Sequence, residues 1–223
     1  MPKLTGNMLK IIAAITMVLD HTAVMFFPRA QLLRLIGRLA FPIFAFMIAE
    51  GCRYTRNRVK YFLQIFTLAV VCQLVYYIFS GSMYLSVLFT FSLSILTIYA
   101  LNALKENPTP ARWLMLGAVV AGVFWLNEVY EIDYGFWGCM AGVFAALPAN
   151  TQFDQLENRV SCFAVGLLIL ATATNTLQYG ALLAVPLLQL YNGQRGKRKM
   201  KYFFYIFYPV HLAVLQGLAM LLD

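Results

Sequence analysis

The amino-acid sequence predicts an all-α fold, a polytopic bundle of transmembrane helices. Of its 223 residues, 61% are hydrophobic and 12% are charged, a composition that cannot supply the surface of an ordinary water-soluble protein. The apolar runs are long and lack the period-two alternation of outer-membrane barrel strands, so the spans should be helices. The connections are short, which leaves no room for a soluble domain and predicts a single integral membrane domain over residues 1–223.

About nine apolar segments are predicted to cross the membrane. In chain order they are 9–27, 35–52, 60–80, 84–104, 112–127, 133–149, 160–176, 179–192 and 202–222. Several of the later segments are shorter than the roughly 20 residues that cross a bilayer core, so we expect them to be tilted, re-entrant or shielded within the bundle. The first segment is too long for a cleaved signal peptide and should stay in the mature protein.

The placement of basic residues predicts the orientation. With nine spans and a cytoplasmic N-terminus, Arg29, Arg34 and Arg38 lie toward the outside, and every other Lys and Arg lies on the cytoplasmic side, as expected for membrane proteins. Topology therefore explains the net charge of +8, and nucleic-acid binding is not predicted. The four cysteines and two histidines lack metal-ligand spacing, so no metal site is predicted.

Ionisable residues inside the spans are the candidates for chemistry, because such groups are costly at membrane depth and usually serve function. A rise of 1.5 Å per residue places His21 about 18 Å and His211 about 15 Å from the inner ends of their spans. The two histidines should therefore share one level. Arg38 enters from the opposite face, and Asp20 is its expected partner. Consecutive helical residues diverge by about 100°, so Asp20 and His21 should face different neighbours.

Two prolines lie beside these groups. Pro42 removes the helical donor for the Arg38 carbonyl, so the second span should kink there, and Pro209 does the same for the Tyr205 carbonyl near His211. Irregular backbone next to buried titratable groups is typical of a cavity within a membrane protein. We expect His21 to face that cavity, with Asp20 turned toward Arg38.

Several motifs resemble the TraX family of bacterial membrane proteins, named for a conjugation protein that N-acetylates pilin. The resemblance runs nearly end to end. Its motifs are Leu19-Asp20-His21; Gly37-Arg38-Leu39-Ala40-Phe41-Pro42-Ile43-Phe44-Ala45-Phe46; Glu50-Gly51 with Thr55-Arg56-Asn57; Phe89-Thr90; Tyr134-Gly135 with Gly138; Leu190-Tyr191-Asn192-Gly193 with Arg195-Gly196; and Phe207-Tyr208-Pro209-Val210-His211.

The resemblance implies an enzyme of the bacterial cytoplasmic membrane, an acyltransferase that uses a cytoplasmic acyl-CoA, with acetyl-CoA the expected donor. An imidazole titrates near pH 6.5 and can take a proton from an attacking amine or hydroxyl, or carry the acyl group. His21 is the predicted base, with His211 as second base, positioning group or proton relay. Arg38 either stabilises the oxyanion or forms only a structural bridge with Asp20.

The polyanionic donor needs cations on the cytoplasmic side. The predicted binding residues are Arg53, Thr55, Arg56 and Arg195, the last within a basic run from 195 to 201. Arg56 is favoured because it belongs to the Thr-Arg element of the family, whereas topology alone could explain the others. Glu50 either pairs with a loop arginine to hold this segment as a donor-binding mouth or caps the membrane boundary.

The acceptor stays open among a peptide amino terminus, a sugar, a lipid and a small molecule, and membrane lipids surround the protein. A proton-coupled transporter is the alternative function, because mid-membrane His, Asp and Arg also form proton relays. No inverted repeat or paired broken helix accompanies them. A membrane scaffold is the third possibility, and the buried polar cluster disfavours it.

Overall fold

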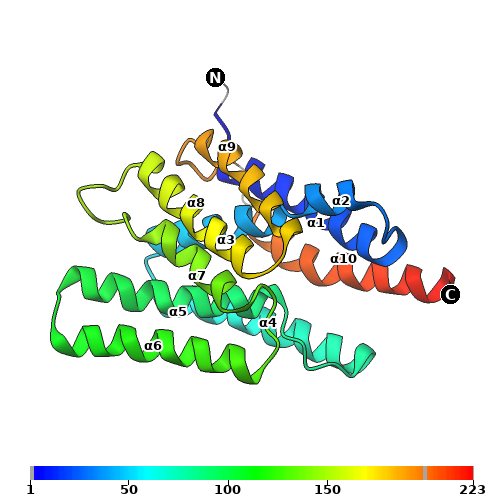
Figure 1. Ribbon diagram of the computed structural model, residues 1–223, viewed down its shortest axis with the longest axis horizontal. Coiled ribbons are helices and arrows are strands. Elements are labelled where there is room, and N and C mark those ends of the chain that lie inside the picture. The colour runs from blue at the N-terminus through cyan, green and yellow to red at the C-terminus, as the bar shows by residue number, and fades with distance from the viewer. Residues whose placement is uncertain (1–2, 198–199, 223) are drawn as a thin grey trace. The chain divides into compact units, whose positions relative to one another are not determined.

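The computed structural model describes residues 3–197 and 200–222, and these are helical almost throughout (Figure 1). The predicted all-α membrane bundle is confirmed. The helices are α1 (Gly6–Phe26), α2 (Gln31–Gly37), α3 (Ala40–Tyr54), α4 (Arg58–Ser80), α5 (Val87–Glu106), α6 (Pro110–Val129), α7 (Gly135–Ala146), α8 (Leu156–Ala173), the 3-10 helix η1 (Thr176–Leu183), α9 (Ala184–Gln189) and α10 (Lys201–Leu222).

Within the described residues, seven helices are long and apolar enough to cross a membrane. They coincide with seven of the nine predicted spans. The other two predicted segments are shorter than expected: 133–149 forms the 12-residue α7, and 179–192 forms η1 followed by the six-residue α9. Pro186 cannot donate to the carbonyl of residue 182, which explains why no continuous α-helix runs through the second of these segments.

The chain folds as two compact units. The first contains both ends of the chain, up to Phe44 and from Thr174 onward, and the second is Ala45–Ala173. The boundary falls inside α3. The single domain expected over the whole length stays a prediction.

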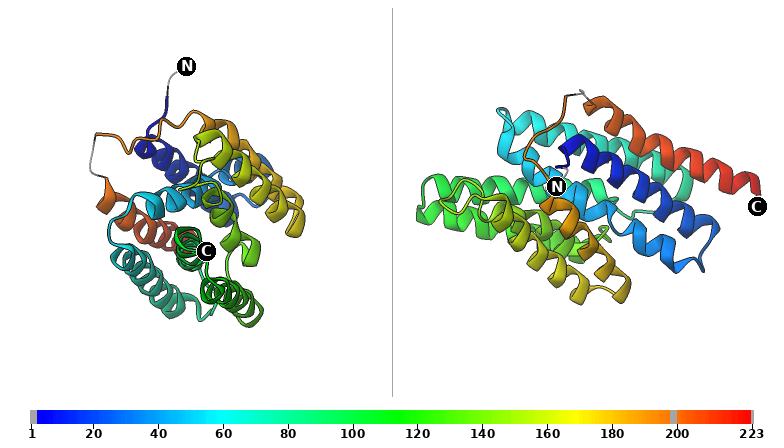
Figure 2. Two further views of the ribbon diagram at one scale, coloured as in Figure 1. Left: turned by 90° about the vertical axis from the view of Figure 1, so that its left-hand side faces the viewer. Right: turned by 90° about the horizontal axis from the view of Figure 1, so that it is seen from above.

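The first unit is held together by backbone contacts between the chain ends. Leu4 N donates to Leu190 O at 2.7 Å, and Asn7 N donates to Arg195 O at 2.9 Å. Packing of α1 against both α2 and α10 completes the unit (Figures 1 and 2). The η1–α9 segment runs from the level of Arg38 to the level of Leu4, so it covers a large part of the membrane depth despite its short helices.

A break in the second predicted span separates α2 from α3. The helix stops at Gly37 and resumes at Ala40, which confirms the expected interruption. Pro42 has no N–H to donate to the Arg38 carbonyl. Arg38 therefore lies at a helix end, where its side chain can leave the α2 surface.

In the second unit, α4, α6 and α7 pack against α5. Side chains of α5 tie both ends of α7: Thr90 Oγ1 donates to Asp133 O at 2.6 Å, and Lys105 Nζ donates to Ala146 O at 2.6 Å. The 15 residues between Thr90 and Lys105 rise about 22 Å. The short α7 therefore follows α5 through most of the membrane depth.

Candidate functional site

The two histidines of the chain contact each other in the first unit. Nδ1 of His21, on α1, lies 3.0 Å from Nε2 of His211, on α10, and the ring centroids are 5.1 Å apart. His211 is buried, with 7% of its surface exposed. The prediction that both histidines share one level is confirmed.

The hydrogen-bond partners determine which ring nitrogens carry protons. Nδ1 of His211 lies 3.0 Å from the carbonyl oxygen of Phe207, and a carbonyl can only accept, so this nitrogen donates. In a neutral His211, Nε2 must then accept, and Nδ1 of His21 donates to it. The remaining nitrogen, Nε2 of His21, carries a lone pair and has no hydrogen-bond partner among the described residues. It is the nitrogen available to act as a base.

Asp20 and Arg38 form the ion pair expected from the sequence. Arg38 Nη2 lies 3.5 Å from Asp20 Oδ2, and both side chains are largely buried. Gly37 makes this approach of α2 to α1 possible, because a Cβ at that position would lie 2.3 Å from Asp20 Cβ. A third residue joins the pair: Arg38 Nη1 donates to Gln178 Oε1, on η1, at 3.4 Å.

The four predicted catalytic residues thus form two adjoining pairs in one unit. Asp20 contacts Arg38 and His21 contacts His211, as expected for consecutive helical residues that face different neighbours. Asp20 therefore does not orient the imidazole of His21, and His211 does so instead. The arrangement can supply a neutral base next to a fixed cation. Catalytic roles for these residues stay predictions.

The predicted donor-binding residues have different surroundings. Arg53 pairs with Asp154 at 2.7 Å, and Thr55 Oγ1 donates to Asn57 O at 3.3 Å. Arg56 is exposed, and no side chain of the described residues pairs with it. These three residues belong to the second unit. Arg195 is exposed in the first unit, and Arg198 and Lys199 of the same basic run lie outside the described residues.

A buried ionic network around Glu50 was only partly predicted. Glu50 pairs with Arg159 of α8, and Arg159 Nε lies 3.2 Å from Asp154 Oδ1. Asp154 in turn binds Arg53. Glu50 does pair with an arginine, as one interpretation of the sequence required, but that arginine lies on a helix. The donor-binding role of this segment stays a prediction.

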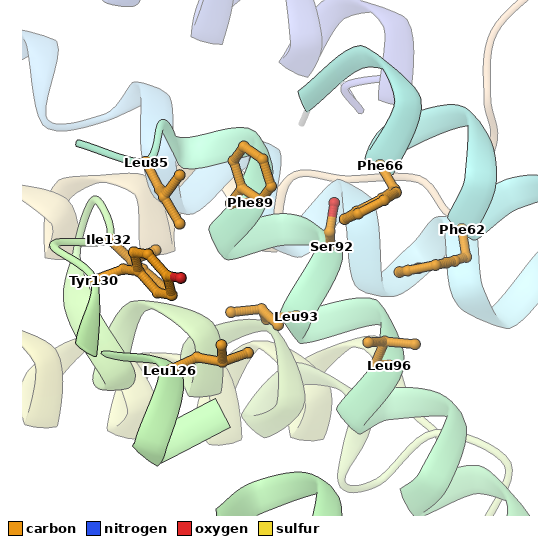
Figure 3. A pocket seen from close by; sticks show the side chains of 10 residues that line it. All are labelled: Phe62, Phe66, Leu85, Phe89, Ser92, Leu93, Leu96, Leu126, Tyr130 and Ile132. Atoms are coloured by element: carbon orange, nitrogen blue, oxygen red, sulfur yellow. The ribbon is translucent and has the colours of Figure 1, made fainter. Parts of the chain in front are cut away.

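An apolar cavity of about 210 Å³ lies between α4, α5 and α6 in the second unit (Figure 3). Phe66, Phe89 and Leu93 are among its lining residues. Two lining residues carry hydroxyls, Ser92 and Tyr130, and the Ser92 hydroxyl already donates to Leu88 O at 2.8 Å. None of the predicted site residues lines this cavity, and most of its lining is apolar.

Elsewhere in the described residues, no group of three or more His, Cys, Asp or Glu side chains could hold a metal ion. Cys52, Cys72, Cys139 and Cys162 are free thiols.

Fold and site together define a multi-pass helical membrane protein with a buried histidine pair beside an arginine–aspartate pair. The chain belongs to the TraX family, whose model, described as TraX protein, matches residues 5–219. It is also similar to the probable fimbrial assembly protein FimC, serogroup H1, of Dichelobacter nodosus, with 29% identity over 248 aligned residues that cover 96% of each chain. No solved structure matches the chain.

Proposed function

We propose that this protein is an acyltransferase of the bacterial cytoplasmic membrane, with its N-terminus in the cytoplasm. It transfers an acetyl group from cytoplasmic acetyl-CoA to an amine or hydroxyl. The single observation that carries this proposal is the hydrogen-bond chain from Phe207 O through His211 to His21, which leaves Nε2 of His21 as a free base. Arg38 supplies a positive charge close to these histidines, because it pairs with Asp20, the residue that precedes His21.

In the proposed reaction, the acceptor nitrogen or oxygen attacks the thioester carbonyl while His21 Nε2 takes its proton. The carbonyl oxygen becomes negative, and Arg38 stabilises this charge. The carbon–sulfur bond then breaks, and the His21 imidazolium gives its proton to the departing CoA sulfur. CoA leaves as the thiol, and His21 is neutral again. His211 keeps the His21 imidazole in the required tautomer, because its Nε2 accepts a hydrogen bond from Nδ1–H of His21 throughout.

In the first unit, Arg195 is the exposed cation proposed to bind the phosphates of the donor. In the second unit, Arg56 is the candidate for this role, because Arg53 is already paired with Asp154. Among the four acceptor classes, a peptide amino terminus has the most support. A relative over nearly the full length is a probable fimbrial assembly protein, and fimbriae are built from exported polypeptides.

A proton-coupled transporter is the second candidate, because two hydrogen-bonded histidines could pass a proton between them. The observed chain disfavours it. His211 Nδ1 donates to the Phe207 carbonyl, which cannot take up the proton and pass it on. A relay along this path would therefore end at Phe207.

The test is acetyl-CoA binding by calorimetry in detergent, followed by CoA release with three acceptors: a synthetic peptide with a free amino terminus, glucosamine and phosphatidylethanolamine. We expect Arg56→Ala to weaken binding and Arg29→Ala, a change at an equally exposed arginine on the opposite predicted face, to leave it unchanged. His21→Ala should bind the donor and release no CoA. Absence of binding by folded wild type would refute the proposal, and proton flux without CoA release would support the transporter.

A further inference from the structure

Gln178 is a buried polar residue to which the sequence assigns no role. It lies in η1 and is 2% exposed. Its backbone is fixed by Asn175, which caps η1: Gln178 N donates to Asn175 O at 3.0 Å and to Asn175 Oδ1 at 3.2 Å. The amide side chain is therefore carried by a well-defined turn.

Glycine brings this turn against the break between α2 and α3. A Cβ at Gly180 would lie 3.1 Å from Leu35 O and 3.3 Å from Arg38 Cβ, so glycine allows a closer approach than almost any residue with a side chain. The η1 backbone at Gly180 thus lies directly beside Arg38. Gly37 permits the equivalent close approach of α1 on the Asp20 side.

The Arg38 guanidinium is held by two different elements. Asp20 Oδ2, from α1, faces Nη2 at 3.5 Å, and Gln178 Oε1, from η1, accepts from Nη1 at 3.4 Å. Asp20 already balances the arginine charge. The neutral amide adds a second acceptor without adding an unpaired negative charge at membrane depth, which would be costly.

The two ends of the Gln178 amide differ in what they contact. Oε1 accepts from Arg38, whereas Nε2 is buried and has no hydrogen-bond partner among the described residues. A buried amide with an unsatisfied N–H destabilises a protein relative to an apolar residue of similar shape. Among the described residues, the hydrogen bond that the Gln178 side chain makes is therefore the one through its oxygen.

We infer that Gln178 is a positioning residue of the acyl-transfer site, which uses its Oε1 atom to hold the Arg38 guanidinium in the orientation that faces the reacting carbonyl. This inference rests on the proposed function. Gln178 itself touches no reacting atom. It acts through Arg38, because a guanidinium held from one side only could rotate away from the developing oxyanion.

Two substitutions separate the oxygen from the rest of the side chain. Gln178→Glu keeps an acceptor oxygen in either protonation state, and Gln178→Met has the same length without an acceptor. Gln189→Met, at an exposed glutamine of α9, is the matched control. CoA release from acetyl-CoA is measured with the peptide acceptor, and modification of Arg38 by phenylglyoxal is followed by peptide mass spectrometry.

We expect Gln178→Met to lower kcat by about 10- to 100-fold, as small misplacements of a catalytic group do, with KM for acetyl-CoA unchanged. Arg38 should react faster with phenylglyoxal in this variant. Gln178→Glu should restore most of the activity and the slow modification. If the methionine variant does not fold, Gln178→Asn, which retracts the oxygen by one methylene, should show the same loss.

Equal losses in the Glu and Met variants would overturn the inference, because the oxygen would then not be the acting atom. Unchanged kcat and unchanged Arg38 modification in Gln178→Met would overturn it as well. If wild type releases no CoA with any acceptor, the proposed function fails. The phenylglyoxal comparison still tests whether Gln178 holds Arg38, so the two failures are distinguishable.

Discussion

Gly37→Ala should separate α1 from α2 and disturb the Asp20–Arg38 pair. The added Cβ would lie 2.3 Å from Asp20 Cβ and 2.8 Å from Asp20 Cα. Carbon atoms in contact are about 3.5 to 4.0 Å apart, so the two helices must move apart by about 1 Å. Neither Asp20 atom can rotate away, because both are fixed by the backbone. Overpacking of this kind costs about 1 to 3 kcal/mol of stability.

The same displacement affects the proposed chemistry. The Arg38 Nη2 to Asp20 Oδ2 distance is already 3.5 Å, so a further separation of about 1 Å breaks the ion pair. A misplacement of this size can cost about 100-fold in rate. Gly37→Ala should therefore lower both the unfolding temperature and the rate of CoA release.

The assay for stability is thermal unfolding in detergent, monitored by the loss of helical circular dichroism. Cys52, Cys72 and Cys139 lie in the second unit, so the reaction of their buried thiols with a fluorescent maleimide reports the unfolding of that unit. Gly117→Ala in α6 is the control, because no atom lies within 4 Å of the added Cβ and alanine favours a helix by about 1 kcal/mol over glycine. Equal unfolding temperatures and equal activities for Gly37→Ala and Gly117→Ala would refute the reasoning.

Further variants test the buried ion pair and the histidine chain. Glu50→Gln should cost about 3 kcal/mol, because it removes one of the two carboxylates that face the buried Arg159 and leaves Asp154, which also pairs with Arg53. Arg58→Ala, which removes an exposed pair with Glu106, should cost about 0 to 1 kcal/mol. Similar unfolding temperatures for both variants in the thiol assay would contradict this. His211→Leu removes the acceptor for His21 Nδ1 and should slow CoA release by about 100- to 10,000-fold. Acetyl-CoA binding, measured by calorimetry, should stay intact. A wild-type rate of CoA release would show that His211 does not set the tautomer of His21.

Sequence reasoning predicted the helical membrane fold, the Asp20–Arg38 pair and the shared level of the two histidines, whereas the contact between His21 and His211 became visible only in the structure. Charged and imidazole groups are rare in apolar spans, so Asp20, His21, Arg38 and His211 stand out without any structure. The depth of each follows from a constant helical rise. Pro42 similarly marks the break beside Arg38, because a missing N–H has the same local effect in any helix.

The residues that sequence reasoning missed depend on tertiary contacts. Gln178 is neutral and lies between two segments expected to be α-helices, 160–176 and 179–192, so nothing local indicated that a 3-10 turn would bring it to Arg38. Arg159 was attributed to membrane topology because it lies just before a predicted span. Its pairing with Glu50 and Asp154 becomes visible only when α3 and α8 are packed together. The sequence predicted that the later segments would be short, but not that 179–192 would divide into a 3-10 helix and α9, since hydropathy reports apolar length and not helix type.

Contacts within the first unit give the distance along α1 between Arg195 and the histidine pair. Asn7 N, in the first turn of α1, donates to Arg195 O at 2.9 Å, so Arg195 is tied to the start of the helix that carries His21. The 14 residues from Asn7 to His21 rise about 21 Å along α1. A donor whose phosphates bind at Arg195 must therefore reach far into the bundle before its thioester meets Nε2 of His21. Coenzyme A has this form, with a long pantetheine arm between its phosphates and its sulfur, whereas a compact donor such as acetyl phosphate could not contact both residues. The depth of His21 is thus consistent with the proposed acyl-CoA donor, provided that its phosphates bind at Arg195.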